Sequence, residues 1–203
     1  MDFKLKVCGM RDHKNIGDLI SLRPDFIGFI FYEKSPRFIG DNNIPEIPDS
    51  IQKVGVFVNE SKEFILAEAQ KYSLKFIQLH GDESVELVQE LKLAGLSIIK
   101  VFSVMDEMPV ERIRVFENFV DYFLFDTKTS AYGGSGNKFN WSILKQYDSK
   151  VPFFLSGGIT TTDIPVIKSL ELNQLYAIDV NSKFEVSPGL KDIQKLEILK
   201  EEL

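Results

Sequence analysis

The sequence predicts an α/β fold in which a single domain, residues 1–203, forms a closed (β/α)8 barrel, the TIM barrel. Two observations lead to this fold class. Eight short apolar segments start at intervals of 21 to 30 residues, and helix-like segments lie between them. Most of these segments are apolar at successive positions, as expected for strands that are buried on both faces of a parallel sheet.

The eight predicted strands follow directly from the positions of the apolar segments. They cover residues 5–8, 26–31, 54–58, 76–80, 98–102, 122–126, 152–155 and 177–180. No linker, low-complexity tract or long charge run divides the chain, so all eight are assigned to one domain. An open doubly wound sheet is the alternative, but an early Gly-x-Gly-x-x-Gly turn, typical of such sheets, is missing.

Helix signals lie between most of the predicted strands. Ser61 and Thr162 are candidate N-caps, and Asp82 precedes an apolar pattern at Val85, Val88 and Leu91. A stripe of apolar residues within 193–199 predicts a closing helix. Residues 33–50 contain three prolines, so a long loop with at most a short helix is expected there.

Composition and charge exclude several classes of protein. Lys and Arg number 24 against 30 Asp and Glu, which gives a net charge of −6 and argues against a basic nucleic-acid footprint. No apolar stretch reaches the roughly 18 residues of a membrane helix, and the first residues lack the apolar segment of a signal peptide. We therefore expect a cytoplasmic protein without nucleic-acid or membrane partners. The single cysteine, Cys8, excludes an intrachain disulfide and a cysteine-cluster metal site.

Polar residues recur where the predicted strands end. The loops after the strand C-termini build the active site of a parallel barrel, so these residues are expected on one rim. A barrel with a purely structural role has no need of so many polar groups there. The rim residues, in chain order, are Cys8, Arg37, Asn59, His80, Asp126, Ser156, Gly157, Gly158, Asp179, Asn181 and Ser182.

The ends of the seventh and eighth strands predict a phosphate site. Gly157 and Gly158 let the backbone approach a ligand and expose its N–H groups, and Asn181 and Ser182 offer hydrogen-bonding side chains. A Gly-Gly pair is also common in plain tight turns. Barrels often bind phosphate after strands seven and eight, and this position favours the phosphate interpretation.

Asp126 and Cys8 are the candidate proton-transfer groups. Asp126 ends an aromatic-rich strand, where burial raises a carboxyl pKa and suits a general acid; alternatively it caps the loop at Thr127. Cys8 ends the first strand, where a thiolate can act as base or nucleophile; alternatively it is a small buried hydrophobe. No protease-like Cys/His/Asn context is present, so the role of base is favoured.

Arg37 and His80 are candidates for binding. Arg37 follows a proline that stiffens its loop, and a guanidinium can grip a carboxylate through two hydrogen bonds; a solvated surface charge is the alternative. His80 is assigned a secondary role, and His13 a surface position. The two histidines and the scattered carboxylates lack metal-ligand spacing, so no metal is expected. Residues 132–141 contain three glycines and form either a loop that covers a ligand or an exposed flexible loop.

The ordered set of these segments resembles the phosphoribosylanthranilate isomerase family of tryptophan biosynthesis. Asn181 departs from the family pattern, which usually has serine, and Asn140 replaces a common aspartate. An asparagine can still donate a hydrogen bond or cap a helix. The matching segments are residues 6–10, 28–37, 54–59, 78–81, 124–127, 133–136, 155–158 and 179–182, followed by the family's closing Pro-Gly-x-Lys-Asp signature at 188–192.

The resemblance implies a cofactor-free Amadori rearrangement of N-(5′-phosphoribosyl)anthranilate to 1-(2-carboxyphenylamino)-1-deoxyribulose 5-phosphate. Asp126 falls on the family's general acid, which opens the ribose ring to a Schiff base, and Cys8 on the base that takes the C2′ proton. Arg37 falls on the residue that binds the anthranilate carboxylate, and Asp179 on a rim carboxylate facing the sugar. The glycine pair and the Asn-Ser pair fall on the phosphate loops.

Two other interpretations remain open. Another phosphate-binding barrel, such as a sugar-phosphate epimerase or a histidine-pathway isomerase, is typified by paired carboxylates or a metal cluster, and Cys8 with Arg37 argues against it. A barrel that only binds a sugar phosphate is disfavoured because a candidate acid and a candidate base are both present. The expected partner is a small phosphorylated substrate, and the expected state is a monomer or a homodimer.

Overall fold

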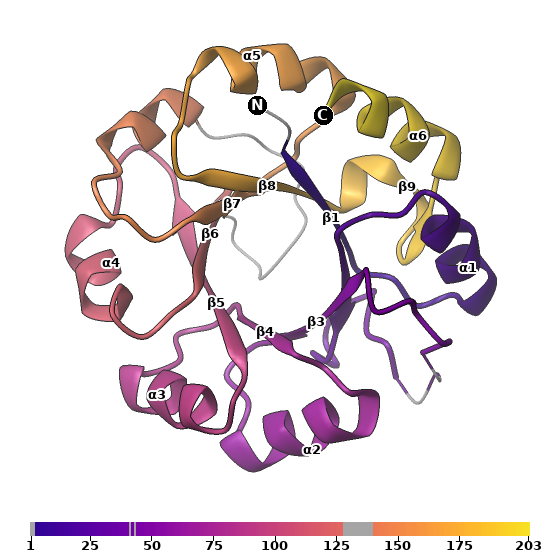
Figure 1. Cartoon of the computed structure of the whole chain (residues 1–203), viewed down its shortest axis with the longest axis horizontal. Helices are drawn as coiled ribbons and strands as arrows, with labels where there is room; N and C mark the ends of the chain where they lie inside the picture. Colours follow the sequence, from indigo (N-terminus) through magenta and orange to yellow (C-terminus); the bar gives the residue numbers. More distant parts are fainter. Residues whose placement is uncertain (1–2, 41, 43, 128–139) are drawn as a thin grey trace.

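Eight parallel strands close into a barrel in the computed structural model, which describes residues 3–40, 42, 44–127 and 140–203 (Figure 1). β8 returns to pair with β1, with Lys4 opposite Ala177 and Val7 opposite Val180, so the sheet has no free edge. The predicted closed barrel is therefore confirmed, and the open sheet is excluded. The strands are β1 Lys4–Cys8, β2 Phe26–Ile30, β3 Gln52–Phe57, β4 Phe76–Leu79, β5 Ser97–Val104, β6 Tyr122–Thr127, β7 Phe153–Leu155 and β8 Leu175–Val180.

Helices surround the barrel on its outside (Figure 1). The described residues between β2 and β3 form no helix, as the prolines of this stretch predict. Among the helices of the described ranges, none combines the length and the apolar character needed to cross a membrane. The helices are α1 His13–Ser21, α2 Lys62–Tyr72, α3 Val85–Leu93, α4 Val110–Phe116, α5 Ile164–Ser169 and α6 Ile193–Glu202, with 3-10 turns η1 Trp141–Gln146, η2 Thr161–Asp163 and η3 Ser182–Phe184.

A short antiparallel hairpin lies between β8 and α6. It consists of β9 Glu185–Ser187 and β10 Leu190–Lys191, and its register shifts between the two residues of β10. The hairpin is not part of the barrel sheet. It carries the Pro-Gly-x-Lys-Asp signature, whose Asp192 donates its backbone N–H to the carbonyl of Phe184 in η3 at 2.9 Å.

Side-chain caps begin several helices, and one of the predicted caps is confirmed at α2. Ser61 accepts a hydrogen bond from the backbone N–H of Phe64. The apolar pattern after Asp82 is helical from Val85, and the cap of α3 is Ser84, whose side chain accepts from the backbone N–H of Leu87. The carboxylate of Glu83 is turned back into the preceding loop, where it accepts from the backbone N–H of Gly81.

The segment after β7 begins differently from the prediction. Thr160 and Asp163 form a reciprocal capping box around η2, in which Asp163 accepts from the backbone N–H of Thr160 at 2.7 Å. Thr162 therefore lies inside the 3-10 turn and is not the cap. The carboxylate of Asp163 can bond the backbone N–H of the cap residue, which a cap at Thr162 would not permit.

The apolar core has two parts, because successive strand side chains point to opposite sides of the sheet. Outward positions such as Leu5, Val7 and Phe29 pack under the helices. Inward positions near the strand N-termini fill the barrel with an aromatic layer, in which neighbouring ring centroids lie as close as 5.0 Å. Burial on both sides explains why the strands are apolar at successive positions. The aromatic layer consists of Phe26, Phe76, Tyr122, Phe154 and Tyr176.

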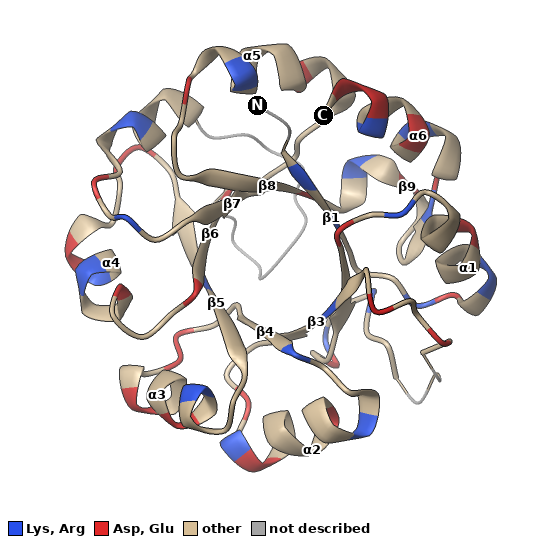
Figure 2. Ribbon diagram, in the orientation of Figure 1, with Lys and Arg blue, Asp and Glu red and all other residues tan. Residues whose placement is uncertain are grey.

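Acidic and basic side chains are mixed on the outer helices rather than separated by sign (Figure 2). Such mixing gives the outer surface little long-range attraction for an anionic ligand. The groups that recognise a ligand must therefore act at short range, from the ends of the strands.

Candidate active site

A pocket of about 410 Å³ opens at the C-terminal ends of the strands. Its volume lies in the range of small-molecule sites. Six predicted site residues line it: Cys8, Arg37, His80, Asp126, Asp179 and Asn181. The predicted Gly157, Gly158 and Ser182 are not among its lining residues, although their chain neighbours Ser156 and Asn181 are.

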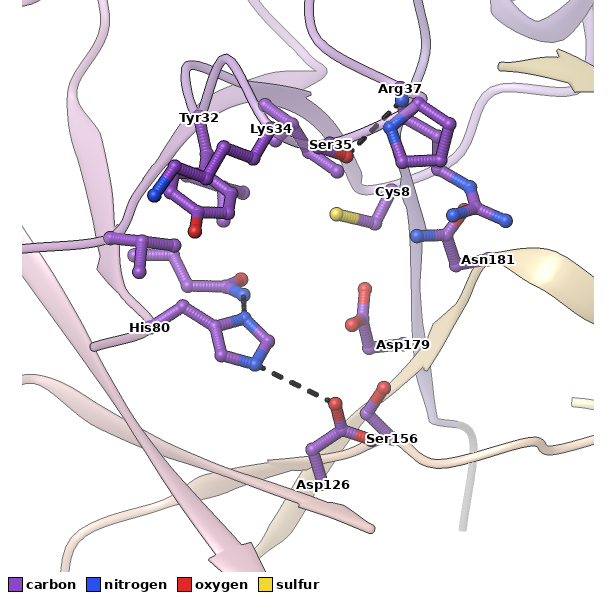
Figure 3. Close-up of a pocket in the computed structure, with 15 residues that line it drawn as sticks. Cys8, Tyr32, Lys34, Ser35, Arg37, His80, Asp126, Ser156, Asp179 and Asn181 are labelled. Carbon is purple, nitrogen blue, oxygen red and sulfur yellow. Dashed lines mark hydrogen bonds and ion pairs between the residues drawn. The ribbon is translucent and has the colours of Figure 1, made fainter. Parts of the chain in front are cut away.

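Strand geometry brings the candidate acid and base to this pocket. Cys8 is the last residue of β1 and Asp126 lies near the end of β6, more than a hundred positions later in the chain. Both occupy inward positions of their strands. Figure 3 shows Cys8 and Asp126 on opposite sides of the pocket, with the carboxylate of Asp179 between them.

A buried polar layer supports the floor of the pocket. The ammonium of Lys6 donates to Asp179 Oδ1 and to Gln78 Oε1, both at 2.8 Å. The side chain of Lys6 is fully buried, so these bonds replace the water it loses. Lys6 and Gln78 were missed from the sequence, although each lies two positions before a predicted site residue, Cys8 or His80, and so points to the same side of its strand.

The polar layer also fixes the proton position on His80. Gln78 must present its amide oxygen to Lys6, so its amide nitrogen faces His80 Nδ1 at 3.2 Å. Nδ1 therefore accepts, and the imidazole proton is assigned to Nε2. Burial and the charge of Lys6 lower the pKa of His80 to about 4, so the ring is neutral at neutral pH. Its Nε2 lies 3.7 Å from Asp126 Oδ2.

A second buried ion pair holds the turn that carries His80. Glu83 accepts from the backbone N–H groups of Gly81 at 2.8 Å and Asn59 at 3.0 Å. Lys100 neutralises this carboxylate at 2.6 Å, and both side chains are almost completely buried. The loops after β3 and β4 are thus tied together, which limits the positions available to the imidazole.

Asp126 has the environment of a general acid. Burial, opposed by a hydrogen bond from the backbone N–H of Thr127 and assisted by the charge of Asp179, raises its pKa to about 6. The Thr127 bond to Oδ1, 2.8 Å long, is the loop cap considered as the alternative. It leaves Oδ2 free to face His80, so capping and acid catalysis are compatible.

Cys8 is buried beside two ammonium groups. Burial raises the pKa of its thiol above the ordinary value, while the charges of Lys6 and Lys191 act in the opposite direction and Asp179 opposes them. The thiol form therefore predominates in the free protein. Gly28 lies against the sulfur, and a Cβ there would approach Sγ to 2.8 Å, which shows how closely the neighbouring strand packs.

Arg37 is not a solvated surface charge. Its Nε donates to Glu185 Oε1 at 2.9 Å, and its Nη2 donates to Oε2 at 2.6 Å. Glu185 also accepts from the ammonium of Lys191 at 2.6 Å. Glu185 and Lys191 were not among the predicted site residues, because no local pattern links them to the loop of Arg37.

The turn after β7 has the backbone form that two glycines predict. Gly157 and Gly158 adopt φ values of +98° and +66°, which residues with side chains rarely adopt. A Cβ on Gly157 would lie 2.3 Å from Thr127 Oγ1, so the close approach requires glycine. Asn181 lies at the other phosphate candidate, and its Oδ1 accepts from Lys191 at 2.6 Å.

The glycine-rich loop predicted to cover a ligand falls mostly in residues 128–139, which lie outside the described residues. Asn140 is described, and it caps η1 by accepting from the backbone N–H of Ser142 at 3.1 Å. Across the described residues, His, Cys, Asp and Glu side chains form no group of three or more that could hold a metal ion.

Comparison with known proteins gives one consistent family. The family model for N-(5'phosphoribosyl)anthranilate (PRA) isomerase matches residues 5–201. The isomerase of Phocaeicola vulgatus is 46% identical over 189 residues, which cover 93% of this chain and 91% of the relative. The isomerase of Thermotoga neapolitana is 37% identical and covers 93% and 92% of the two chains.

Solved structures agree with the sequence comparison. The isomerase from Thermotoga maritima superposes with a TM-score of 0.83 at 33% identity and covers 99% of this chain and 100% of its own. An isomerase in complex with reduced 1-(o-carboxyphenylamino)-1-deoxyribulose 5-phosphate has a TM-score of 0.81 at 30% identity and covers 98% and 97%. The chain therefore belongs to the N-(5′-phosphoribosyl)anthranilate isomerase family, the isomerases of tryptophan biosynthesis.

Proposed function

We propose that this pocket isomerises N-(5′-phosphoribosyl)anthranilate by general acid–base catalysis, with Asp126 as the acid and Cys8 as the base. The observation that carries the proposal is the position of these two groups on opposite sides of one pocket (Figure 3). A ribose between them would meet a proton donor on one side and a proton acceptor on the other. Family membership supports the reaction, and the site geometry supports the two roles.

The reaction begins at the ribose ring. Asp126 gives its proton to the ring oxygen while the C1′–O bond breaks, and the anthranilate nitrogen lone pair forms the C1′=N bond of a Schiff base. The neutral Nε2–H group of His80 then faces the carboxylate that remains, 3.7 Å away in the free protein, and stabilises its charge.

The second step takes place at C2′. The thiolate of Cys8 removes the C2′ proton, and the electron pair of that C–H bond forms the C1′=C2′ bond as the nitrogen recovers its lone pair. The resulting enolamine tautomerises to the aminoketone product, with the C2′ hydroxyl proton lost and a proton gained at C1′. The ammonium of Lys6 favours the thiolate, because its positive charge opposes the increase in the Cys8 pKa that burial causes.

Binding is assigned to the two ends of the substrate. Arg37 takes the anthranilate carboxylate, and Asp179 faces the sugar hydroxyls. The phosphate is assigned to the loops after β7 and β8, through Gly157, Gly158, Asn181 and Ser182. The relative that holds a reduced form of the product supports a small phosphorylated ligand of this kind.

The direct test follows the fluorescence of the anthranilate substrate with the purified protein, with and without EDTA. We expect the same rate of substrate loss in both conditions. Loss of activity in EDTA would favour a metal-dependent barrel enzyme instead. Ligand binding without turnover would favour a non-catalytic sugar-phosphate-binding barrel.

We also propose a cytoplasmic protein that is a monomer or a homodimer. One solved relative, from Thermotoga maritima, is described as dimeric. Light scattering at several protein concentrations distinguishes the two states, and a larger assembly would contradict the proposal.

A further inference from the structure

The Pro-Gly-x-Lys-Asp signature has no role in the reaction proposed above. Two of its residues have clear structural tasks. Gly189 adopts a φ of +82° where a Cβ would lie 2.4 Å from the side chain of Arg11, and Asp192 caps α6 by accepting from the backbone N–H of Lys195. Lys191 is different, because its side chain is fully buried and its ammonium donates to Asn181, which lines the pocket.

The backbone of Lys191 is held in place by a residue of α1. Asn15, in α1, donates from its side chain to the carbonyl of Lys191 at 2.9 Å and accepts from its N–H at 2.7 Å. These two hydrogen bonds between the Asn15 side chain and the Lys191 backbone hold β10 against α1. The ammonium then donates to Glu185 Oε1 and to Asn181 Oδ1, both at 2.6 Å.

Glu185 joins the two cations of this network. Its carboxylate accepts hydrogen bonds from Nε and Nη2 of Arg37 and from the ammonium of Lys191. It also accepts from the backbone N–H of Gly189 at 3.1 Å. Burial acts to raise the pKa of Glu185, but the positive charges of Arg37 and Lys191 and the backbone bond outweigh it and hold this pKa below the ordinary value, so the carboxylate is ionised at neutral pH. Its side chain is only 5% exposed.

These contacts determine which groups face the pocket. Glu185 occupies one edge of the Arg37 guanidinium, and among the described residues Nη1 has no hydrogen-bond partner. Lys191 occupies Asn181 Oδ1, which leaves the amide nitrogen of Asn181 as the free donor. Figure 3 shows this nitrogen pointing into the pocket below Arg37. Gly9 permits the arrangement, since a Cβ there would lie 2.8 Å from Arg37 Cδ.

The charges of the network favour an anionic ligand group. Arg37 and Glu185 alone would form a neutral pair with little attraction for a carboxylate. Lys191 adds a second positive charge that is fully withdrawn from water, so the three side chains carry a net charge of +1 beside the pocket. A carboxylate that binds to Arg37 neutralises this charge.

We propose that Glu185 and Lys191 are positioning residues for recognition of the substrate carboxylate. Glu185 orients Arg37 so that its remaining N–H groups face the pocket, and Lys191 supplies the charge that Glu185 would otherwise cancel. The inference rests on the proposed function, because it assigns the carboxylate to Arg37.

The test uses two probes and four proteins. The probes are reduced 1-(2-carboxyphenylamino)-1-deoxyribulose 5-phosphate and its phenylamino counterpart without the ring carboxylate. The proteins are the wild type, Glu185→Gln, Lys191→Met and the control Lys195→Met, an exposed lysine of α6. Calorimetry gives Kd for each pair. We expect Glu185→Gln and Lys191→Met to weaken the carboxylate probe about tenfold or more beyond any change in the counterpart, which shares the phosphate but lacks the ring carboxylate. Lys195→Met leaves both unchanged.

A second background separates positioning from folding. In Arg37→Ala, adding Lys191→Met should weaken the carboxylate probe by clearly less than it does in the wild type, because the guanidinium that the network orients is gone. Equal weakening of both probes, or full additivity with Arg37→Ala, would overturn the inference and leave only a structural role.

If Glu185→Gln fails to fold, Lys191→Gln tests the same network. A wild type that binds neither probe would reject the proposed function itself, whereas selective binding by the wild type without selective loss in the variants rejects only the inference.

Discussion

Asp126 and His80 face each other across 3.7 Å, and burial acts on their charges in opposite ways. It raises the pKa of Asp126 to about 6 and lowers that of His80 to about 4. The imidazole is cationic only at a pH where the carboxyl is protonated, so the two do not form an ion pair in the free protein. His80 is instead a neutral donor beside an acid that can lose its proton.

The proposed roles of Asp126 and Cys8 predict a specific kinetic result. Asp126→Asn and Cys8→Ser each remove one proposed proton-transfer group, and we expect each to lower kcat by about 10²–10⁴-fold. Steady-state kinetics on variants with native circular dichroism measures the effect. Asp82→Asn is the matched control, because this carboxylate is largely exposed, and it should keep wild-type kcat. Wild-type turnover in Asp126→Asn or Cys8→Ser would reject the role of that residue.

The residues that could be predicted from the sequence are those that follow a buried strand. Cys8, His80, Asp126 and Asp179 each interrupt an apolar run, and the alternation of strand side chains places them on the inner side. The partner of Arg37 could not be predicted in this way. Glu185 is 148 positions away, and the pairing depends on a hairpin with a register shift that no local pattern reports.

At the level of elements, the turn after β7 is sensitive to any side chain. Gly157→Ala would place a methyl group 2.3 Å from Thr127 Oγ1 at a φ of +98°. We expect a loss of stability on the order of 1–3 kcal/mol and a higher KM, because the same turn is assigned to the phosphate. Thermal unfolding and steady-state kinetics measure the two effects.

Gly17→Ala provides the opposite result in the same protein. Gly17 lies within α1, where a Cβ would meet nothing within 4 Å. The substitution should stabilise the protein by roughly 0.5–1 kcal/mol, because alanine loses less backbone entropy in a helix.

The same thermal unfolding experiment tests both glycines. Equal melting temperatures for Gly157→Ala and the wild type would show that the turn after β7 accommodates a methyl group without loss of stability.

Helix boundaries were predicted less well than strands. The strands follow from an apolar pattern that burial on both sides enforces, whereas a cap depends on the local path of the chain. Asp82 and Ser84 are both good N-cap residues, and the choice between them is made by the carboxylate of Glu83, which is bound to Lys100 on a different strand. Information of this kind is tertiary and is absent from the local sequence.

For the whole molecule, Asp126 and His80 have opposite effects on the pH dependence of stability. The folded-state pKa of Asp126, about 6 against 3.8, means that the folded protein holds this proton more tightly, so its contribution to stability falls as pH rises from 4 to 6. The folded-state pKa of His80, about 4 against 6.5, means that its contribution falls as pH decreases from 6.5 to 4. Each effect is on the order of 3 kcal/mol, and they nearly cancel.

Single substitutions should expose the two effects separately. Relative to the wild type, Asp126→Asn should lose stability as the pH is lowered from 6.5 to 4, because only the His80 effect remains. His80→Gln should lose relative stability as the pH is raised from 4 to 6. Urea unfolding at pH 4, 5, 6 and 7 measures both differences. Parallel stability curves for the three proteins would show that neither pKa is shifted as described.

The aromatic layer that fills the far end of the barrel determines how substrate enters and product leaves the pocket. Five rings fill the interior below the polar layer, so the pocket opens only at the C-terminal ends of the described strands. Substrate and product must therefore enter and leave through the same opening. Because both occupy the same site, the product is expected to be a competitive inhibitor with respect to the substrate.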